Sequence, residues 1–427
     1  MEEWKEVRLD SLVNRKICYG IVQPGFSPKN GIPVIKVNNV VKGLRDVSEC
    51  DKTTEEISNS YKRTILKGGE LIISLVGTVG CIDIAPSSFA GANLVRATGM
   101  IDIEDELIKH WVLYYIRTRQ GQQYIEENLN TTVQRALNIK DLCKMPIPIT
   151  SKHYMGRIVS ILKSLDDKIE VNRKINENLE QQAQALFKSW FVDFEPFLDK
   201  PSGKAERKNG EFVESELGMI PKGWRVEKIG NLPINVTDYV ANGSFASLKE
   251  NVKLYQTPEY AYFIRNTDLK SGNYEVYVDK HSYEFLSKST LYGGEVIISN
   301  VGDVGSVHLC PYLDKPMTLG NNIIMLKPDK QYYSFFLYIL FKWAYGNDLI
   351  MSIKGGSAQP KFNKTDFKSL KIIVPNDVVL EKYHSIISSL FNKIRVLEDE
   401  SRRLAELRDT LLPKLMSGEL KVNEIEK

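Results

Sequence analysis

The sequence predicts an α+β protein in which two similar mixed α/β domains are each followed by a long helix. The first observation is a duplication, because the segment GGELIIS at 68–74 recurs 225 residues later as GGEVIIS at 293–299. A repeat this long indicates a duplicated domain, since solenoid units have periods of only about 20–50 residues. The second observation is a heptad pattern that follows each domain at the same offset. Two such halves predict a pseudo-twofold molecule, which suits a partner with two half-sites.

Within each domain, short β-branched segments predict strands and glycines predict the turns between them. Each copy of the repeat runs into a Gly-x-x-Gly sequence, at Gly77 and Gly80 and again at Gly302 and Gly305. We expect tight turns there, where the backbone bends or approaches a ligand closely. An aromatic segment predicts a core helix at 111–115 and again at 335–339. The predicted strands are 33–37, 71–76 and 82–85 in the first copy, and 261–265, 296–301 and 323–326 in the second.

The long helices show the alternating steps of three and four residues that mark a coiled-coil seam. No Pro or Gly interrupts 158–190, and about 33 helical residues span roughly 50 Å. Since nothing else in the sequence offers a partner, each helix is expected to pair with its own copy, either parallel or antiparallel. The seam residues are Leu162, Leu165, Ile169, Leu179 and Leu186 in the first helix, and Ile387, Leu390, Ile394, Leu404 and Leu411 in the second.

Polar residues interrupt this seam at Asn172, Asn176, Ser401 and Arg408. If they are buried, they fix the register of the pair at some cost in stability. An exposed edge of the seam accounts for them equally well.

These patterns divide the chain into five segments. A stretch of Pro, Gly and charged residues between the first helix and the second domain marks a surface linker. The expected segments are a first domain at 1–150, a first helix at 151–195, a linker at 196–220, a second domain at 221–378, and a second helix with a C-terminal tail at 379–427.

Composition is that of an ordinary globular protein, with 57 Lys+Arg against 54 Asp+Glu and a net charge of only +3. A charge this small gives no field over the whole molecule, although nucleic acid needs only a local basic face. Five scattered cysteines, a charged N-terminus without a signal peptide and no apolar run near 20 residues predict a cytoplasmic protein without a membrane span. No metal site is expected.

Catalytic motifs are missing from the sequence. It has no Gly-x-x-x-x-Gly-Lys-[Ser/Thr] phosphate loop and no Asn/Asp-Pro-Pro-aromatic loop of an adenine methyltransferase. Its five histidines share no triad spacing with a nucleophile and an acid. The sequence therefore predicts a non-catalytic protein.

Polar residues at the strand ends and loops suit DNA recognition instead. Base edges are read by Arg, Lys, Asn and Gln, while hydroxyl groups contact phosphates. Each one alone is better explained as a solvated loop residue, and only the matched set in two domains carries the hypothesis. The candidates are Lys36, Asn38, Thr78, Asn93, Arg96, Gln134 and Arg135 in the first copy, and Arg265, Asn266, Asn300, Asn322, Lys354, Ser357, Gln359 and Lys361 in the second.

The chain resembles the specificity (S) subunits of type I restriction-modification systems over nearly its whole length. The resemblance is carried by the two GE[LV]IIS segments at 69–74 and 294–299, by LFKSWFVDF at 186–194, by IPKGW at 220–224, and by LLPKLMSGEL at 411–420. It implies two target recognition domains, each reading one half of a bipartite, asymmetric double-stranded DNA site. It also implies that the two helices are antiparallel and set the spacer between the half-sites.

The resemblance further implies a division of labour among subunits. Two modification (methyltransferase) subunits would dock on the helices and use S-adenosylmethionine, and restriction subunits would supply ATP- and Mg-dependent translocation and cleavage. This chain would bind no cofactor itself. Two alternatives remain. One is a coiled-coil adaptor between proteins that makes no direct DNA contact, and the other is a self-sufficient enzyme whose site the sequence motifs do not reveal.

Overall fold

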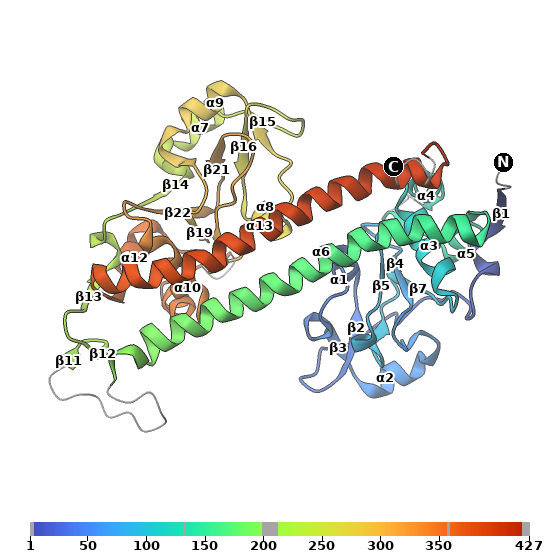
Figure 1. Cartoon of the computed structure of the whole chain (residues 1–427), viewed down its shortest axis with the longest axis horizontal. Helices are drawn as coiled ribbons and strands as arrows, with labels where there is room; N and C mark the ends of the chain where they lie inside the picture. The colour runs from blue at the N-terminus through green and yellow to red at the C-terminus, as the bar shows by residue number, and fades with distance from the viewer. Residues whose placement is uncertain (1–3, 131–133, 199–211, 357–358, 421–427) are drawn as a thin grey trace. The chain divides into compact units, whose positions relative to one another are not determined.

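The computed structural model describes residues 4–130, 134–198, 212–356 and 359–420, which form two compact units (Figure 1). Unit 1 comprises Met1–Asn172 and Glu398–Lys427, and unit 2 comprises Arg173–Leu397. Two long helices, α6 (Lys152–Phe187) and α13 (Asp377–Met416), contribute to both units. The units therefore divide within the helices, whereas the sequence predicted divisions at the helix ends.

Unit 1 is built on a sheet in which β4 lies between β5 and β7, with both pairs antiparallel. All four residues of β4 are buried, because its two faces meet different cores: Leu71 and Ile73 pack with α3, and Ile72 packs against the second sheet, β3-β2-β6. The described strands are β1 (Lys5–Arg8), β2 (Ile32–Ile35), β3 (Asp51–Thr53), β4 (Leu71–Ser74), β5 (Ile82–Ile84), β6 (Asn93–Leu94), β7 (Thr98–Ile101), β8 (Leu129–Asn130), β9 (Ala136–Leu137) and β10 (Pro146–Ile149). The helices are α1 (Val37–Lys42), α2 (Glu55–Ser60), α3 (Glu106–Arg117), α4 (Arg119–Glu127) and α5 (Ile139–Cys143).

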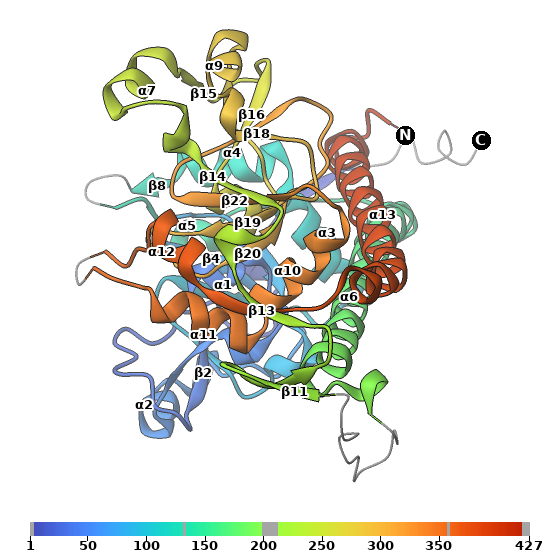
Figure 2. The same cartoon turned by 90° about the vertical axis from the view of Figure 1, so that its left-hand side faces the viewer.

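Unit 2 repeats this plan with a four-stranded sheet, β14-β22-β19-β20, covered by α10 (Figure 2). The described strands are β11 (Phe212–Ser215), β12 (Gly218–Pro221), β13 (Arg225–Lys228), β14 (Ile234–Asp238), β15 (Leu254–Tyr255), β16 (Ala261–Ile264), β17 (Tyr277–Val278), β18 (Thr290–Leu291), β19 (Val296–Ser299), β20 (Val307–Leu309), β21 (Met317–Leu319), β22 (Ile323–Pro328) and β23 (Lys371–Val374). The helices are α7 (Phe245–Asn251), α8 (Asn266–Ser271), α9 (Lys280–Phe285), α10 (Tyr332–Lys342), α11 (Ala344–Ser352) and α12 (Lys364–Ser369).

The six predicted strands correspond to β2, β4 and β5 in unit 1 and to β16, β19 and β22 in unit 2. The two aromatic segments lie in α3 and α10, as predicted. The fold class is thus confirmed as two mixed α/β domains with long helices. Strands β4 and β19 end two residues earlier than expected, because the glycine turn has already begun to bend the chain there.

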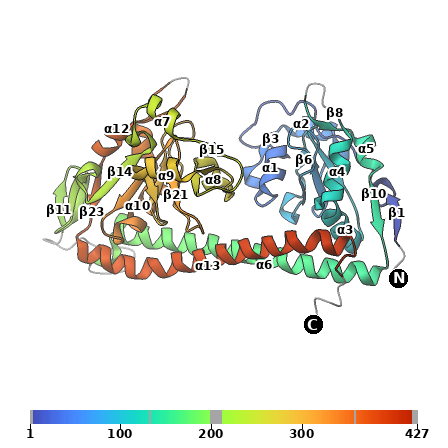
Figure 3. The same ribbon diagram turned by 90° about the horizontal axis from the view of Figure 1, so that it is seen from above.

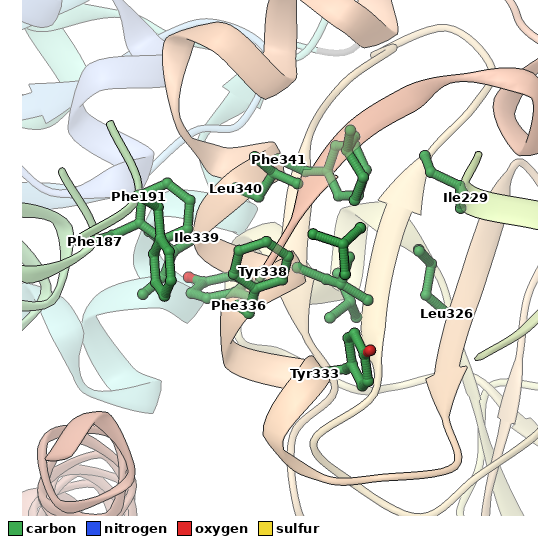
Figure 4. Packing of buried hydrophobic residues seen from close by; sticks show 14 of the residues in the cluster. Phe187, Phe191, Ile229, Leu326, Tyr333, Phe336, Tyr338, Ile339, Leu340 and Phe341 are labelled. Carbon is green, nitrogen blue, oxygen red and sulfur yellow. The ribbon is translucent and has the colours of Figure 1, made fainter. Parts of the chain in front are cut away.

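The core of unit 2 is aromatic where the end of α6 meets α10 (Figure 4). The ring centroid of Phe187 lies 5.0 Å from that of Phe191 and 5.9 Å from that of Phe336. Tyr383 of α13 packs edge-on against Phe191, with their centroids 4.7 Å apart. Rings at these separations gain stability beyond their buried area, so this cluster ties both long helices to the second domain.

The two long helices are antiparallel in each unit (Figure 3). In unit 1, Asp166 of α6 contacts Arg408 of α13, while Asn172, farther along α6, contacts Ser401, which comes earlier in α13. Of the predicted seam residues, Leu162, Ile387 and Ile394 are buried, and Leu165, Ile169, Leu179, Leu186, Leu390, Leu404 and Leu411 are half-buried. The 36 residues of α6 span roughly 54 Å at about 1.5 Å per residue.

Two polar interruptions of the seam are built into the helix pair. Asn172 is buried, and its Nδ2 donates to Glu400 Oε2 at 2.8 Å and Ser401 Oγ at 3.3 Å. Arg408 is half-buried and donates to Asp166. For these residues the buried interpretation holds, rather than an exposed edge.

The predicted linker at 196–220 is partly wrong. Its last residues form the β11–β12 hairpin, where Phe212 and Ile220 are buried in the core of unit 2. These apolar side chains need a core to leave water, so the hairpin is part of the second domain. In the described ranges, no helix combines the length and apolarity needed to cross a membrane.

Candidate nucleic-acid interface

The Gly-x-x-Gly turn has the same geometry in both units. The backbone N–H of Gly80 donates to the carbonyl of Ser74 at 3.0 Å, and that of Gly305 donates to Ser299 at 3.0 Å. Gly80 and Gly305 have φ angles of +88° and +89°. This is a conformation that residues with a Cβ rarely adopt, so the turn requires glycine.

A second loop is hydrogen-bonded to the first glycine of each turn. The N–H of Gly77 donates to the carbonyl of Arg135, and the N–H of Gly302 donates to the carbonyl of Pro360, both at 2.9 Å. Each unit thus brings together two loops that are more than 50 residues apart in the sequence.

A side-chain amide from the following helix holds each turn from behind. Gln122 of α4 donates to the Gly80 carbonyl at 3.1 Å, and Asn347 of α11 donates to the Gly305 carbonyl at 3.3 Å. A turn held by backbone and side-chain bonds on both sides is a rigid platform for the residues at its tip.

In unit 1 this platform carries Thr78, Gln134 and Arg135, which are all exposed. The Gln134 amide lies beside the turn, since a Cβ placed on Gly77 would be 3.8 Å from its Nε2. The Arg135 guanidinium is paired with Glu126 of α4. Thr78 and Gln134 are therefore exposed to solvent, whereas Arg135 would first have to leave its carboxylate.

Three other predicted residues of unit 1 gather around a shallow, largely apolar hollow beside α1. Lys36, Asn38 and Arg96 are exposed at its rim, and the Lys36 ammonium group pairs with Asp51. The residues that line it are Ile21, Val22, Pro24, Lys36, Val37, Asn38, Val95, Arg96 and Ala97. Two cations and an amide above an apolar floor could contact phosphates and base edges.

Asn93 does not belong to any exposed surface, so its predicted DNA contact is wrong. Its side chain is 0% exposed. The amide accepts from Thr64 Oγ1 at 2.6 Å and donates to Ser58 Oγ at 3.0 Å. Buried amides need such partners, and Asn93 instead joins β6 to the end of α2.

In unit 2, Arg265 is held by an acid three residues further along the chain. Its Nη2 lies 2.6 Å from Asp268 Oδ1 and its Nε lies 2.9 Å from Asp268 Oδ2. The hydrogen bonds to Asp268 raise the pKa of Arg265 above its ordinary value. The guanidinium is thus presented in one orientation at the start of α8, with 39% of the side chain exposed.

Asn266 joins a small charged group on the Gly-x-x-Gly turn of unit 2. Its Nδ2 donates to Asp303 Oδ2 at 3.1 Å, and the Lys270 ammonium lies 2.5 Å from the same oxygen. Partial burial opposes ionisation of Asp303, but the bonds from Lys270 and Asn266 outweigh it and lower its pKa below the ordinary value. The carboxylate therefore stays charged and holds α8 against the turn.

The remaining predicted residues of unit 2 differ in their surroundings. Asn300 is half-buried and its Nδ2 donates to the carbonyl of Phe362 at 3.3 Å, so it holds the loop in place. Asn322 is exposed with a φ of +64°. Lys354, Gln359 and Lys361 are exposed near the Gly355–Lys361 bridge, and Ser357 lies outside the described residues.

Comparison with known proteins identifies this duplicated architecture. The family model described as "Type I restriction modification DNA specificity domain" matches residues 1–181 and 202–406. The chain belongs to the type I restriction-modification specificity family. The match occurs twice, once for each copy of the repeat.

Individual relatives agree with the family match. The chain is 28% identical over 405 residues to the type I restriction enzyme MjaIX specificity subunit of Methanocaldococcus jannaschii, covering 90% of this chain and 84% of that protein. It is 26% identical to the HindI specificity subunit of Haemophilus influenzae, covering 66% and 71%. The S subunit from M. genitalium has the same fold, with a TM-score of 0.50 and 16% identity over 97% of this chain and 96% of that one.

The sequence did not reveal the acids that hold several of the predicted residues of this specificity subunit. Glu126 pairs with Arg135, Asp51 pairs with Lys36, and Asp303 accepts from Asn266. Asp303 could have been found, because it lies inside the repeated Gly-x-x-Gly sequence. Glu126 and Asp51 lie in segments with no repeated signal, and only the fold brings them close.

Proposed function

We propose that this specificity subunit recognises duplex DNA through its two loop platforms, with each unit reading one half of a bipartite, asymmetric site. The observation that carries the proposal is the pairing of identical backbone geometry with different side chains. Thr78 and Arg135 lie on the platform in unit 1, and Asp303 and Pro360 occupy the matching positions in unit 2, whereas Gln134 and Gln359 are the same residue type. Similar platforms with different polar groups would read different bases.

A domain exchange tests independent readout. Residues 1–150 would be replaced by the first domain of another specificity subunit, and the methylated motif would be determined by methylome sequencing. We expect only one half of the motif to change. A change in both halves would refute independent readout.

Salt dependence separates DNA recognition from the rival role of a coiled-coil adaptor that does not touch DNA. The logarithm of the affinity for duplex should fall with the logarithm of salt concentration by about 0.9 for each phosphate neutralised. An adaptor without DNA contact would give no such slope.

The proposed partners are two modification subunits on the long helices, joined by restriction subunits in a complete enzyme. S-adenosylmethionine, ATP and Mg would then be bound by those partner subunits, and this chain would be non-catalytic. Incubation of the purified chain alone with DNA and these cofactors should yield neither methylation nor cleavage. The five free thiols suit a reducing cytoplasm.

The long helices would set the spacer between the half-sites. Deletion of residues 177–180 removes four residues of α6 and shortens it by roughly 6 Å. We expect an altered spacer in the methylated motif or failure to assemble. An active enzyme with the parental spacer would exclude this role.

A further inference from the structure

A polar hollow on the sheet of unit 2 is not part of the loop platform. It has a volume of about 310 Å³ and eight lining residues, none of which is acidic. Two of these carry ammonium groups and five others carry an amide or a hydroxyl. The seven donors are Asn235, Thr237, Ser287, Lys288, Thr290, Tyr292 and Lys327.

The sheet register explains why Asn235, Thr237 and Lys327 face the same side. Strand β14 pairs with β22 so that Asn235 lies opposite Lys327 and Thr237 lies opposite Met325. Their neighbours Val236 and Leu326 point to the opposite face and into the main core. Since side chains alternate along a strand, the fold presents polar groups on the other face.

The two lysines of the hollow are not neutralised by acids. Over the ranges that the structure describes, neither Lys288 nor Lys327 has a carboxylate within ion-pair distance. The Lys327 ammonium lies 4.2 Å from the centroid of the Tyr292 ring, which orients it without cancelling its charge. The nearby Glu295 carboxylate accepts from the N–H groups of Tyr292 and Gly293 at 2.9 and 2.8 Å and does not line the hollow.

The first copy of the repeat fills the corresponding place with its own ion pairs. Arg15 forms a bridge with Asp102, and Asp102 precedes Lys327 by the repeat offset of 225. The guanidinium of Arg15 donates to Asp102, to Glu70 at 2.5 Å and to the Ile65 carbonyl at 3.3 Å. Unit 2 replaces this arginine and aspartate with Asn235 and Lys327, which reverses the charge on the strand and leaves a space open.

We propose that this hollow binds a phosphate oxyanion, and that in the assembled enzyme the phosphate is a phosphodiester of the DNA backbone. Lysine ammonium, hydroxyl and amide groups are the side chains that commonly contact phosphates, and an unpaired cationic recess attracts them. The inference rests on the proposed DNA recognition. It adds a contact that positions unit 2 on the duplex and reads no base.

The test uses the chain assembled with its modification subunits and a duplex that carries its methylated motif. The variant Lys288→Gln/Lys327→Gln removes both cations of the hollow. The control Lys249→Gln/Lys280→Gln removes two exposed lysines from α7 and α9 of the same unit. For the first variant, the slope of log affinity for DNA against log salt concentration should be shallower than the parent's by about 0.9. The ratio of parent to variant affinity should therefore be roughly 3.5-fold smaller at about 200 mM than at about 50 mM salt. The loss should be equal on matched and mismatched duplexes.

The outcomes separate this contact from the proposed function. An unchanged slope in the hollow variant, or an equal fall in the control, overturns the phosphate contact while DNA recognition stands. If the parent complex itself shows no salt-dependent binding, the proposed function fails. Titration of the parent and the hollow variant with inorganic phosphate, without DNA, tests whether the hollow binds a free anion. If only the parent binds phosphate and the salt dependence of DNA binding is the same in both, the ligand is not a phosphodiester of DNA. Urea unfolding of both variants should stay close to the parent, because Lys249, Lys280 and Lys288 are exposed and Lys327 is only half-buried.

Discussion

Asp166 of α6 should be a main point of attachment for α13 in unit 1. Its Oδ1 accepts from Arg408 Nη1 at 2.6 Å, and its Oδ2 accepts from the Tyr114 hydroxyl at 2.9 Å. Burial, followed by the charge of Asp166, raises the pKa of Tyr114 well above its ordinary value, so the phenol remains a donor. The substitution Asp166→Ala would leave a buried hydroxyl and a half-buried guanidinium without this acceptor.

The neighbouring residue provides a matched control on the same helix. Asp167 makes an exposed pair with Lys163 and has 60% of its side chain exposed, against 26% for Asp166. Both substitutions replace Asp with Ala within a helix, so the gain in helix propensity cancels when they are compared. We expect Asp166→Ala to cost about 2–3 kcal/mol because solvent partly reaches the site, and Asp167→Ala to cost less than about 0.5 kcal/mol.

Urea unfolding of the full chain measures the difference, and hydrogen exchange of peptides within 404–416 shows whether it arises at α13. Exchange there should accelerate in Asp166→Ala and remain at the parental rate in Asp167→Ala. A double-mutant cycle with Arg408→Ala should give a coupling energy above about 1 kcal/mol. Equal stability of the two aspartate variants would show that Asp166 does not hold α13.

Three further outcomes follow from burial. Phe187→Ala should destabilise unit 2 by about 3–5 kcal/mol, whereas Val192→Ala, at a side chain 43% exposed, should cost less than about 1 kcal/mol in the same urea titration. Burial, then the charge of Lys342, lowers the pKa of His308 to about 4. Because the unfolded chain takes up this proton first, stability should fall by on the order of 3 kcal/mol between pH 6.5 and 4, and His308→Gln should flatten that profile. Asn93→Ala should lower stability by about 1–3 kcal/mol in urea, while methylome sequencing finds the parental motif; a changed motif would restore its predicted role.

The sequence predicted the parts of the fold whose signals are local. Strands β4 and β19 follow from short apolar runs that end in glycine, and the positive φ angles of Gly80 and Gly305 explain why glycine stands there. The heptad pattern located both long helices. Their antiparallel direction did not follow from periodicity, because an apolar seam is compatible with either direction.

The candidate interface could be predicted only as a set of loops. Asn93 and Asn38 are the same residue type in the same domain, yet one is buried and the other exposed. The difference arises from Ser58 and Thr64, which surround Asn93 only after α2 and β6 have packed together. The predicted free guanidinium of Arg135 is likewise paired with Glu126, which no motif in the sequence connects to it. Side-chain pairing depends on tertiary contacts, which residue type and loop position do not specify.

The repeat itself shows how the loops can diverge without a change of fold. The loop carbonyl that Gly77 contacts in unit 1 belongs to Arg135, and the one that Gly302 contacts in unit 2 belongs to Pro360, yet both bonds measure 2.9 Å. A proline lacks an N–H but keeps its carbonyl, so it can replace an arginine wherever the backbone only accepts. Because this platform uses the loop residue as an acceptor, its side chain is left to vary. Under the proposed DNA recognition, the two units would acquire different base preferences by substitution at one loop position, while the hydrogen bonds that hold the loop remain the same.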